Sequence, residues 1–350
     1  MERDTLRIID ANLNRIGEGL RVLEELARLS LNDKDLTQRL KDLRHEIVQV
    51  NPSLQKRLLT ARDSDGDVGA EMLVKGEEPE RDKNALVMAN ARRAEESLRV
   101  LEEIARLPES GLDTEKYKKA RFALYSIEKE LSAKTGRREK LKRLTGLYVI
   151  IDSNFMDRRS YEDVTRQIVS GGAGIIQLRD KRTDKKAMLE TAEEVKRICA
   201  ENDVMFIIND HLDIALAVDA DGLHIGAGDI PADVTRRLLP PDKILGCSAR
   251  TVEVAVALGK QGADYLGVGA MFYTGTKDGA EVVGKERLQE IKKAVNMSLV
   301  AIGGISKDNA GEVVDAGADA IAVISAVLGA DDIERATRQL VEIIEGGEHG

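Results

Sequence analysis

Three basic residues of this chain have the side chains and the spacing to bind a highly charged anion. Arg179 and Lys181 are two residues apart, and Lys277 follows the hydroxyl residues Thr274 and Thr276. Guanidinium and ammonium groups bind phosphate oxygens, and three cations from two segments suit a diphosphate better than a single phosphate. Taken without its surroundings, the first pair is more typical of a surface charge cluster.

Two carboxylates, Asp210 and Asp229, are candidates to hold a divalent cation. Mg²⁺ is usually bound through one or two carboxylates together with water and substrate phosphates. The sequence has no His/Cys cluster that would favour a softer metal. Capping of the helices that follow is the structural alternative for both residues.

A second anion site is indicated by Gly303-Gly304 and by Ser325. Glycines let the backbone approach a phosphate closely, and a helix N-terminus offers free N–H groups. We expect the helix after the glycines to begin near Ser306. A tight turn that simply requires glycine is the alternative.

The segment from residue 144 onward supplies a scaffold that would gather these residues. Short β-branched runs alternate there with amphipathic segments, and eight such runs in about 205 residues predict an α/β fold, the closed (β/α)₈ TIM barrel. A doubly wound open sheet usually has five or six strands and fits less well. The expected strands are Leu147–Ile151, Gly174–Leu178, Val204–Ile208, Gly222–Ile225, Lys243–Cys247, Tyr265–Val268, Leu299–Ile302 and Ala320–Ile324.

Active sites of such barrels lie at the C-terminal ends of the strands. The candidates stand at or just after expected strand ends, and so do Gln177, Asn209 and Ser248. A rim that served only the fold would not collect so many ligand-like groups.

The first 135 residues form a separate, charged and helical part with an internal repeat. Asn12, Arg15 and the segment Gly19–Glu25 recur 78 residues later as Asn90, Arg93 and Ser97–Glu103. A duplicated helix predicts a pseudo-symmetric helical domain, smaller than the barrel. The repeated polar residues are either a solvated ion-pair ladder or a paired polar site.

Between the two copies, Asp63, Asp65 and Asp67 could bind a divalent ion, but three acidic residues around a glycine are commoner in plain loops. An EF-hand would need Glu where the chain has Val74, so that motif is excluded. The chain also has no glycine-rich Walker loop, which argues against an ordinary P-loop kinase. We expect a helical domain over residues 1–135, a linker over 136–143 and the barrel over 144–350.

Composition excludes several classes of protein. No apolar run is long enough to span a membrane, and the charged N-terminus has no signal-peptide pattern. A net charge of −9 and 3% aromatic residues disfavour a nucleic-acid binder. The two cysteines have no disulfide or metal spacing, which indicates a reducing, cytoplasmic location. The sequence leaves open whether the protein is a homo-oligomer.

Seven short motifs, in this order, resemble the thiamine-phosphate synthase family over roughly residues 144–345: QLRDK, ND, HIGAGD, GCSA, TGTK, AIGGI and VISA. The resemblance implies a Mg²⁺-dependent transferase of thiamine biosynthesis. Its small-molecule substrates would be hydroxymethylpyrimidine diphosphate and a thiazole phosphate, and its products thiamine phosphate and pyrophosphate. The implied mechanism is dissociative and needs no protein nucleophile.

The resemblance also implies roles for individual residues. Those expected at the aminopyrimidine are Gln177 and Ser248. Those expected at the diphosphate are Arg179, Lys181, Asn209 and Lys277, with Mg²⁺ on Asp210 and Asp229. Those expected to line the site or to bind the thiazole phosphate are Thr274, Thr276, Gly304 and Ser325.

Two positions depart from the family pattern. Arg250 stands where many members have His, and the segment Ala270–Tyr273 lacks a frequent proline. A thiazole tautomerase on the same barrel is the nearest rival, but we expect it to rely on that missing His. A non-catalytic phosphate-ligand sensor is a further alternative.

The N-terminal part resembles a helical domain that is fused ahead of such synthases. The residues that carry this resemblance are the two related runs Gly19–Glu25 and Ser97–Glu103. Related domains are associated with phosphorylating hydroxymethylpyrimidine phosphate. The resemblance therefore implies a kinase that would make the diphosphate substrate of the barrel.

Overall fold

The computed structural model describes residues 1–63, 82–275 and 281–346, and it divides into two compact units, Met1–Arg138 and Glu139–Gly350. The described residues of the first unit are helical, and the second unit contains every described strand. The expected fold class, a TIM barrel preceded by a smaller all-helical region, is confirmed.

Eight parallel strands close into a barrel in chain order, and β8 pairs with β1. The strands are β1 (Gly146–Asp152), β2 (Ile175–Arg179), β3 (Met205–Asn209), β4 (Gly222–Ile225), β5 (Ile244–Ala249), β6 (Tyr265–Gly269), β7 (Ser298–Ile302) and β8 (Ala320–Val323). Each coincides with one of the expected runs to within one or two residues. The alternation of short apolar runs with helical segments was therefore sufficient to predict every strand.

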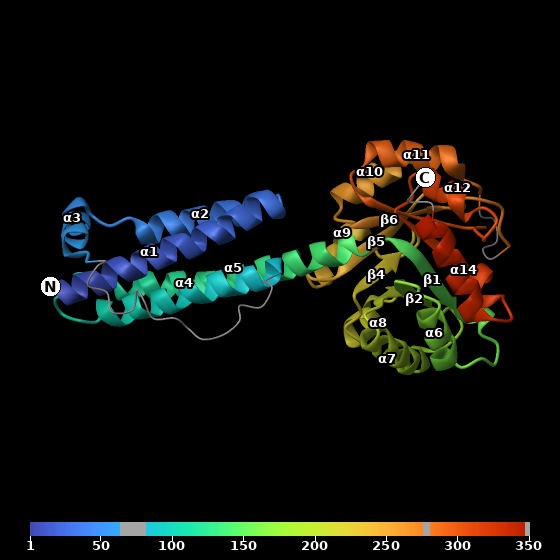
Figure 1. Cartoon of the computed structure of the whole chain (residues 1–350), viewed down its shortest axis with the longest axis horizontal. Coiled ribbons are helices and arrows are strands. Elements are labelled where there is room, and N and C mark those ends of the chain that lie inside the picture. The colour runs from blue at the N-terminus through green and yellow to red at the C-terminus, as the bar shows by residue number, and fades with distance from the viewer. Residues whose placement is uncertain (64–81, 276–280, 347–350) are drawn as a thin grey trace. The chain divides into compact units, whose positions relative to one another are not determined.

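Helices lie on the outside of the strand ring (Figure 1). They are the short 3₁₀ turn η2 (Ser153–Phe155), α6 (Tyr161–Ser170), α7 (Lys185–Glu201), α8 (Leu212–Ala217), α9 (Ala232–Leu238), α10 (Val252–Lys260), α11 (Gly284–Ala294), α12 (Ala310–Asp315), α13 (Ser325–Leu328) and α14 (Ile333–Gly346). Several of these helices have an N-cap side chain. At the start of α7, the Asp184 carboxylate accepts from the N–H groups of Lys186 and Ala187.

Alternation along the strands separates two apolar cores. On β1, Val149 and Ile151 face the surrounding helices, whereas Tyr148 and Ile150 belong to the cluster inside the barrel. Leu144, which precedes β1 and is fully buried, joins the inner cluster. The barrel interior is thus packed below the strand ends that carry the candidate site.

The N-terminal unit is built from two related helix pairs. Its helices are α1 (Arg3–Glu25), the π-helical turn η1 (Leu26–Ser30), α2 (Lys34–Val48), α3 (Pro52–Ala61), α4 (Lys83–Ala105) and α5 (Thr114–Lys142). The duplicated helices α1 and α4 pack against each other closely enough that a Cβ on Gly19 would lie 2.9 Å from the Asn90 carbonyl oxygen. Glycine at this position therefore permits the close approach of the two helices.

Each of the two helix pairs contains an equivalent ion pair. Buried Glu24 on α1 accepts from Arg44 Nε at 2.9 Å on α2, and buried Glu102 on α4 accepts from Arg121 Nη2 at 2.9 Å on α5. Glu24 and Glu102 are related by the 78-residue repeat, so the duplication extends to tertiary contacts. The structure thus supports a duplicated helical unit.

Helix α5 runs through the segment expected to be a linker. Its last residues, up to Lys142, are helical, and the boundary between the two compact units falls after Arg138. The chain therefore passes from one unit to the other within a helix. The helix continues because residues 136–142 contain one Gly and otherwise strong helix-forming residues, without proline.

Candidate active site

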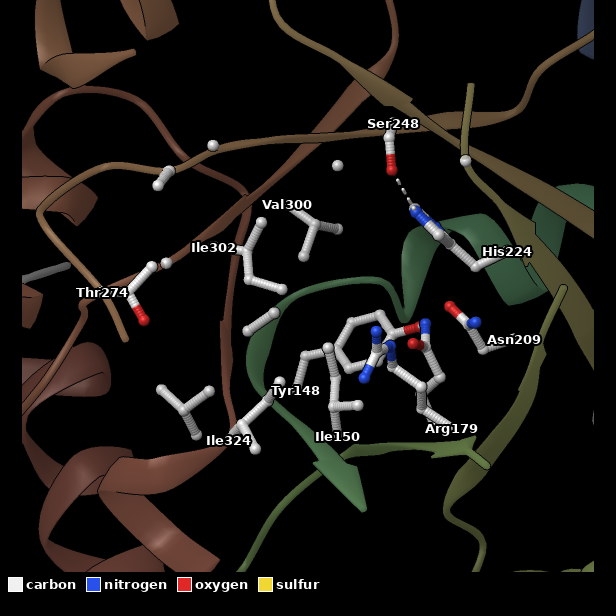
Figure 2. Close-up of a pocket in the computed structure, with 18 of the residues that line it drawn as sticks. Tyr148, Ile150, Arg179, Asn209, His224, Ser248, Thr274, Val300, Ile302 and Ile324 are labelled. Atoms are coloured by element: carbon white, nitrogen blue, oxygen red, sulfur yellow. Dashed lines mark hydrogen bonds between the residues drawn. The ribbon is translucent and has the colours of Figure 1, made fainter. Parts of the chain in front are cut away.

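The expected site residues that the structure describes all line one cavity at the C-terminal ends of the strands, with a volume of about 540 Å³. They are Gln177, Arg179, Lys181, Asn209, Asp210, Asp229, Ser248, Thr274, Gly304 and Ser325. Thr276 and Lys277 lie outside the described residues. Figure 2 shows Arg179, Asn209 and Ser248 directed into this space from separate strands, with Thr274 at its opposite side.

The cationic part of the cavity depends on a carboxylate that the sequence analysis missed. Asp152 ends β1 and lies beside Arg179, the last residue of β2, in the strand register. Its side chain is buried and accepts from the Arg179 guanidinium. Asp152 also accepts from the Asn154 N–H at 2.9 Å, so its carboxylate is fixed from two sides. A polar residue at the end of a predicted strand was the available signal.

The loop after β2 is held by Asp180. Its carboxylate accepts from the backbone N–H of Arg182 at 2.9 Å and of Thr183 at 3.2 Å. Burial raises the pKa of Asp180, but the hydrogen bond from the Thr183 hydroxyl and those from the two N–H groups outweigh it and hold the pKa below its usual value. Lys181 projects from the turn so formed, and its Nζ lies 3.3 Å from Asp210 Oδ2.

Asp210 and Asp229 meet at the cavity, as expected for a shared cation. Asp210 adopts a left-handed backbone conformation with φ of 63°, and its N–H donates to the His224 carbonyl at 2.8 Å. Asp229 Oδ2 accepts from the Gly226 N–H at 2.7 Å. Burial, and then the adjacent Asp210 carboxylate, raise the pKa of Asp229.

These two carboxylates fit a magnesium ion. Two close anions repel each other, and a divalent cation between them relieves that repulsion. No group of three or more His, Cys, Asp or Glu able to hold a metal occurs among the described residues. A two-carboxylate site that is completed by substrate phosphate and water is the arrangement Mg²⁺ commonly adopts.

Gly303 and Gly304 follow β7 with left-handed φ values of 100° and 70°. Side chains are excluded there: a Cβ on Gly304 would lie 2.6 Å from the Tyr273 carbonyl oxygen. The expectation of a helix starting near Ser306 was wrong, because α12 begins at Ala310. Asn309 bridges the gap, since its side chain donates to the Gly304 carbonyl and accepts from the Ser306 N–H.

Three further polar residues line the cavity without having been predicted: Tyr148, His224 and Tyr265. Ser248 Oγ lies 3.1 Å from His224 Nε2, and Gln177 Nε2 donates to Tyr148 Oη at 2.7 Å (Figure 2 shows the first contact). His224 opens the HIGAGD motif, so its position was visible in the sequence. The tyrosines were hidden inside apolar strand runs.

The remaining walls of the cavity are apolar. Ile150, Val300, Ile302 and Ile324 surround the space between the polar groups (Figure 2). Arg250, the residue that departs from the family pattern, also lines the cavity and is exposed. An apolar pocket with a few fixed polar groups is typical of a small-molecule site.

In the N-terminal unit, the repeated polar residues do not share one environment. Asn12 and Asn90 are buried and donate to the carbonyls of Ile8 and Leu86 in their own helices. Arg15 and Arg93 are exposed. Both copies do carry an ion-pair ladder, but it is formed by the next repeated residues along the helix: Arg21 with Glu24 and Glu25, and Arg99 with Glu102 and Glu103.

Only the first of the three aspartates between the copies is described. Asp63 Oδ2 lies 3.6 Å from Arg3 Nη2. Asp65 and Asp67 lie outside the described residues.

A TIM barrel whose strand ends carry cations, two adjacent carboxylates and a glycine turn defines a class: enzymes that act on phosphorylated small molecules. The family model for thiamine monophosphate synthase matches residues 147–327, and the ThiD2 family model matches residues 7–130. Among the described residues no helix is long and apolar enough to cross a membrane.

Individual relatives of the chain agree with the family match over the barrel. A thiamine-phosphate synthase of Thermosynechococcus vestitus is 37% identical over 98% of this chain and 95% of its own length. One from Moorella thermoacetica is 47% identical over 57% of this chain and 95% of its own. A solved thiamine phosphate pyrophosphorylase from Pyrococcus furiosus has 41% identity and a TM-score of 0.54 over 59% of this chain and 97% of its own. The chain belongs to the thiamine-phosphate synthase family, whose members are transferases of thiamine biosynthesis.

Proposed function

We propose that the barrel joins hydroxymethylpyrimidine diphosphate to a thiazole phosphate and releases pyrophosphate. The observation that carries this proposal is the meeting, in one cavity, of a diphosphate-binding group and a separate pair of polar residues that suits a ring edge. Arg179, Lys181 and Asn209 form the first group, and Gln177 and Ser248 form the pair. The glycine turn at Gly304, together with Ser325, would bind the thiazole phosphate.

The reaction breaks the bond between the pyrimidine methylene carbon and the diphosphate oxygen, and the electron pair leaves with the diphosphate. The thiazole nitrogen then supplies the pair that forms the new carbon–nitrogen bond. Charge therefore grows on the departing oxygens, where Arg179 and Lys181 stabilise it. Arg179 is already held by Asp152, so little reorganisation is needed.

Asp210 and Asp229 would hold Mg²⁺ against the diphosphate. The ion, when bound, supplies positive charge to the leaving group. Lys181 lies 3.3 Å from Asp210, so it would sit beside both the metal and the diphosphate. The apolar walls limit access of water to the carbocation that forms during the reaction.

The test is pyrophosphate release by the purified protein with both substrates, in Mg²⁺ or in EDTA. We expect release that requires Mg²⁺ and the thiazole phosphate and that falls about a hundredfold or more in Lys181→Ala, since one charged contact to the leaving group is worth a few kcal/mol. Lys186→Ala, which removes an exposed lysine from α7, is the matched control and should keep activity. Absence of release under every condition would refute the proposal.

For the N-terminal unit we propose the activity that its resemblance implies, phosphorylation of hydroxymethylpyrimidine phosphate to the diphosphate. The support is that this product is the substrate proposed for the barrel and that the ThiD2 family matches residues 7–130. The full chain carrying Lys181→Ala should then consume ATP with the pyrimidine phosphate and accumulate the diphosphate. A folded protein that leaves ATP untouched would contradict the proposal.

A further inference from the structure

Five polar side chains form a continuous hydrogen-bonded chain across the barrel interior, here called the relay. Gln177 on β2 contacts Tyr148 on β1 at 2.7 Å, and Tyr148 contacts Tyr265 on β6 at 3.2 Å. Tyr265 contacts His224 Nδ1 on β4 at 3.1 Å, and His224 Nε2 contacts Ser248 on β5 at 3.1 Å. Its two ends are the residues proposed to recognise the pyrimidine.

Two glycines make room for the rings of the relay. A Cβ on Gly246 would lie 2.1 Å from Tyr265 Cζ, and a Cβ on Gly267 would lie 2.9 Å from His224 Cε1. Neither glycine has a φ in the left-handed region, so neither is needed for a turn. The strands therefore lack side chains at the two places where the relay needs space.

One assignment of protons lets every hydrogen bond of the relay run in the same direction, starting from the Gln177 amide. Burial raises the pKa of both Tyr148 and Tyr265, so each hydroxyl keeps its single proton. Tyr148 accepts from the Gln177 amide, so its own proton is available to donate to Tyr265. Tyr265 can in turn donate to His224 Nδ1, which places the ring N–H on Nε2, from which it can donate to Ser248.

The two ends then present complementary groups to the cavity. Ser248 accepts from His224, so its own hydroxyl proton is directed to a ligand. Gln177 uses its Nε2 on Tyr148, and among the described residues its Oε1 has no hydrogen-bond partner, so this oxygen can accept. An aminopyrimidine offers the matching edge, an amino group that donates beside a ring nitrogen that accepts.

We propose that Tyr148, Tyr265 and His224 are positioning residues that hold Ser248 as a donor and Gln177 as an acceptor, so that the cavity selects an aminopyrimidine over its deaminated, oxo counterpart. The inference rests on the proposed function of the barrel. The oxo ring reverses both groups of the edge, since its oxygen accepts and its ring N–H donates. Binding it would require the Gln177 amide to turn over and every proton of the relay to shift.

The first experiment compares kcat/KM for the aminopyrimidine diphosphate and for the same diphosphate with an oxo group in place of the amino group. The intact protein should prefer the amino substrate by at least about a hundredfold, because the oxo ring leaves buried polar groups unpaired. Tyr265→Phe should reduce this preference by roughly tenfold or more, mainly through KM, while kcat for the amino substrate changes only a few-fold, since the diphosphate contacts remain.

Tyr161→Phe is the matched control, because Tyr161 lies on α6 outside the relay and its hydroxyl has no hydrogen bond among the described residues. It should keep the full preference. His224→Gln is the conservative variant: its amide reaches Ser248 but can turn over, so it should retain turnover and lose the preference. An unchanged preference in folded Tyr265→Phe would overturn the proposal.

The second experiment does not depend on turnover. The chain has four histidines, so selective ¹⁵N-histidine labelling gives a spectrum in which His224→Gln identifies one ring. The relay requires the Nε2–H tautomer in the full-length protein. The Nδ1–H tautomer would overturn the proposal even if the enzyme is active, whereas an Nε2–H ring in a protein that releases no pyrophosphate would refute the proposed reaction and leave the relay in place.

Discussion

At the scale of single residues, three charged groups of the site each have a partner that orients them. Arg179 is held by Asp152, Lys181 approaches Asp210, and Asp229 is fixed by the Gly226 N–H. Partners of this kind stabilise the geometry that catalysis needs before substrate arrives. Asp152 is the most buried of them, at 1% exposure.

Asp152→Asn tests that dependence. The amide still accepts from the Asn154 N–H, so the turn after β1 should remain, but the guanidinium loses its ionic partner. We expect kcat/KM for the pyrimidine diphosphate to fall about ten- to a hundredfold. This is the usual loss when a residue that orients a ligand-binding side chain, here Asp152 beside Arg179, is removed. Steady-state pyrophosphate release measures the effect. Asp163→Asn, on the outer helix α6, is the control, and an equal loss in both variants would contradict this role for Asp152.

At the scale of secondary-structure elements, the barrel joins a packed interior to a polar rim. Alternation places Tyr148 and Tyr265 inside, and the neighbouring strand β5 has Gly246 opposite the Tyr265 ring. In the N-terminal unit, α1 and α4 repeat a helix whose buried glutamate pairs with an arginine of the helix that follows. Both features depend on contacts between elements far apart in the sequence.

Gly246→Ala should displace the Tyr265 ring, because the added Cβ would overlap it. We expect a loss of stability of about 1–3 kcal/mol, the range for overpacking a core, together with a weaker preference for the aminopyrimidine. Thermal unfolding and the substrate comparison measure the two effects. Gly174→Ala is the matched control, since a Cβ there meets nothing within 4 Å. Equal melting temperatures for the two variants would show that the interior adapts.

Glu102→Gln should destabilise the N-terminal unit by about 2 kcal/mol, between the values for exposed and buried pairs because Arg121 stays partly accessible. Burial raises the pKa of Glu102, but Arg121, helped by Arg99 and Arg106, outweighs this and holds it below the ordinary 4.5. A lowered folded-state pKa stabilises the protein above the unfolded value, and this contribution is lost as the pH falls through the folded value.

Urea unfolding followed by circular dichroism measures both parts of this prediction. The difference between the parent protein and Glu102→Gln should be largest near neutral pH and should shrink below about pH 4.5, where the carboxylate is progressively protonated. Glu103→Gln removes a neighbouring glutamate that is 45% exposed and should have little effect. A difference that does not depend on pH would exclude an ionic contribution from Glu102.

At the scale of the whole molecule, two compact units are joined through α5. Relatives of this chain include one that spans nearly all of it and another that matches only about three-fifths of it. The barrel unit starts at Glu139, and its first residues contact the rest of the barrel. Lys140 Nζ lies 3.4 Å from Asp221 Oδ1, and Leu144 packs in the interior cluster.

A fragment of residues 139–350 should therefore fold and should release pyrophosphate within a few-fold of the rate of the full chain. A fragment of residues 145–350 lacks Leu144, which is fully buried, and should be less stable by about 3 kcal/mol. Thermal unfolding and pyrophosphate release on both fragments test this. Loss of activity in a folded 139–350 fragment would show that the barrel requires the N-terminal unit.

The sequence by itself was enough to predict the eight strands, the helical repeat and the candidate cavity residues that the structure describes. The physical reason is that strand periodicity is local, and parallel strands in a closed barrel bring their C-terminal ends together whatever their distance along the chain. Polar residues at those ends, such as Arg179, Asp210 and Ser248, therefore had to meet at one rim.

Tertiary structure alone decided which side chains support that rim. Tyr148 and Tyr265 lie within otherwise apolar strand segments, and the pairing of Asp152 with Arg179 depends on the register and closure of the barrel. The start of α12 at Ala310 and the burial of Asn12 were likewise decided by packing rather than by local propensity. Contacts between side chains on different strands carry no local signal, because they exist only once the strands are paired.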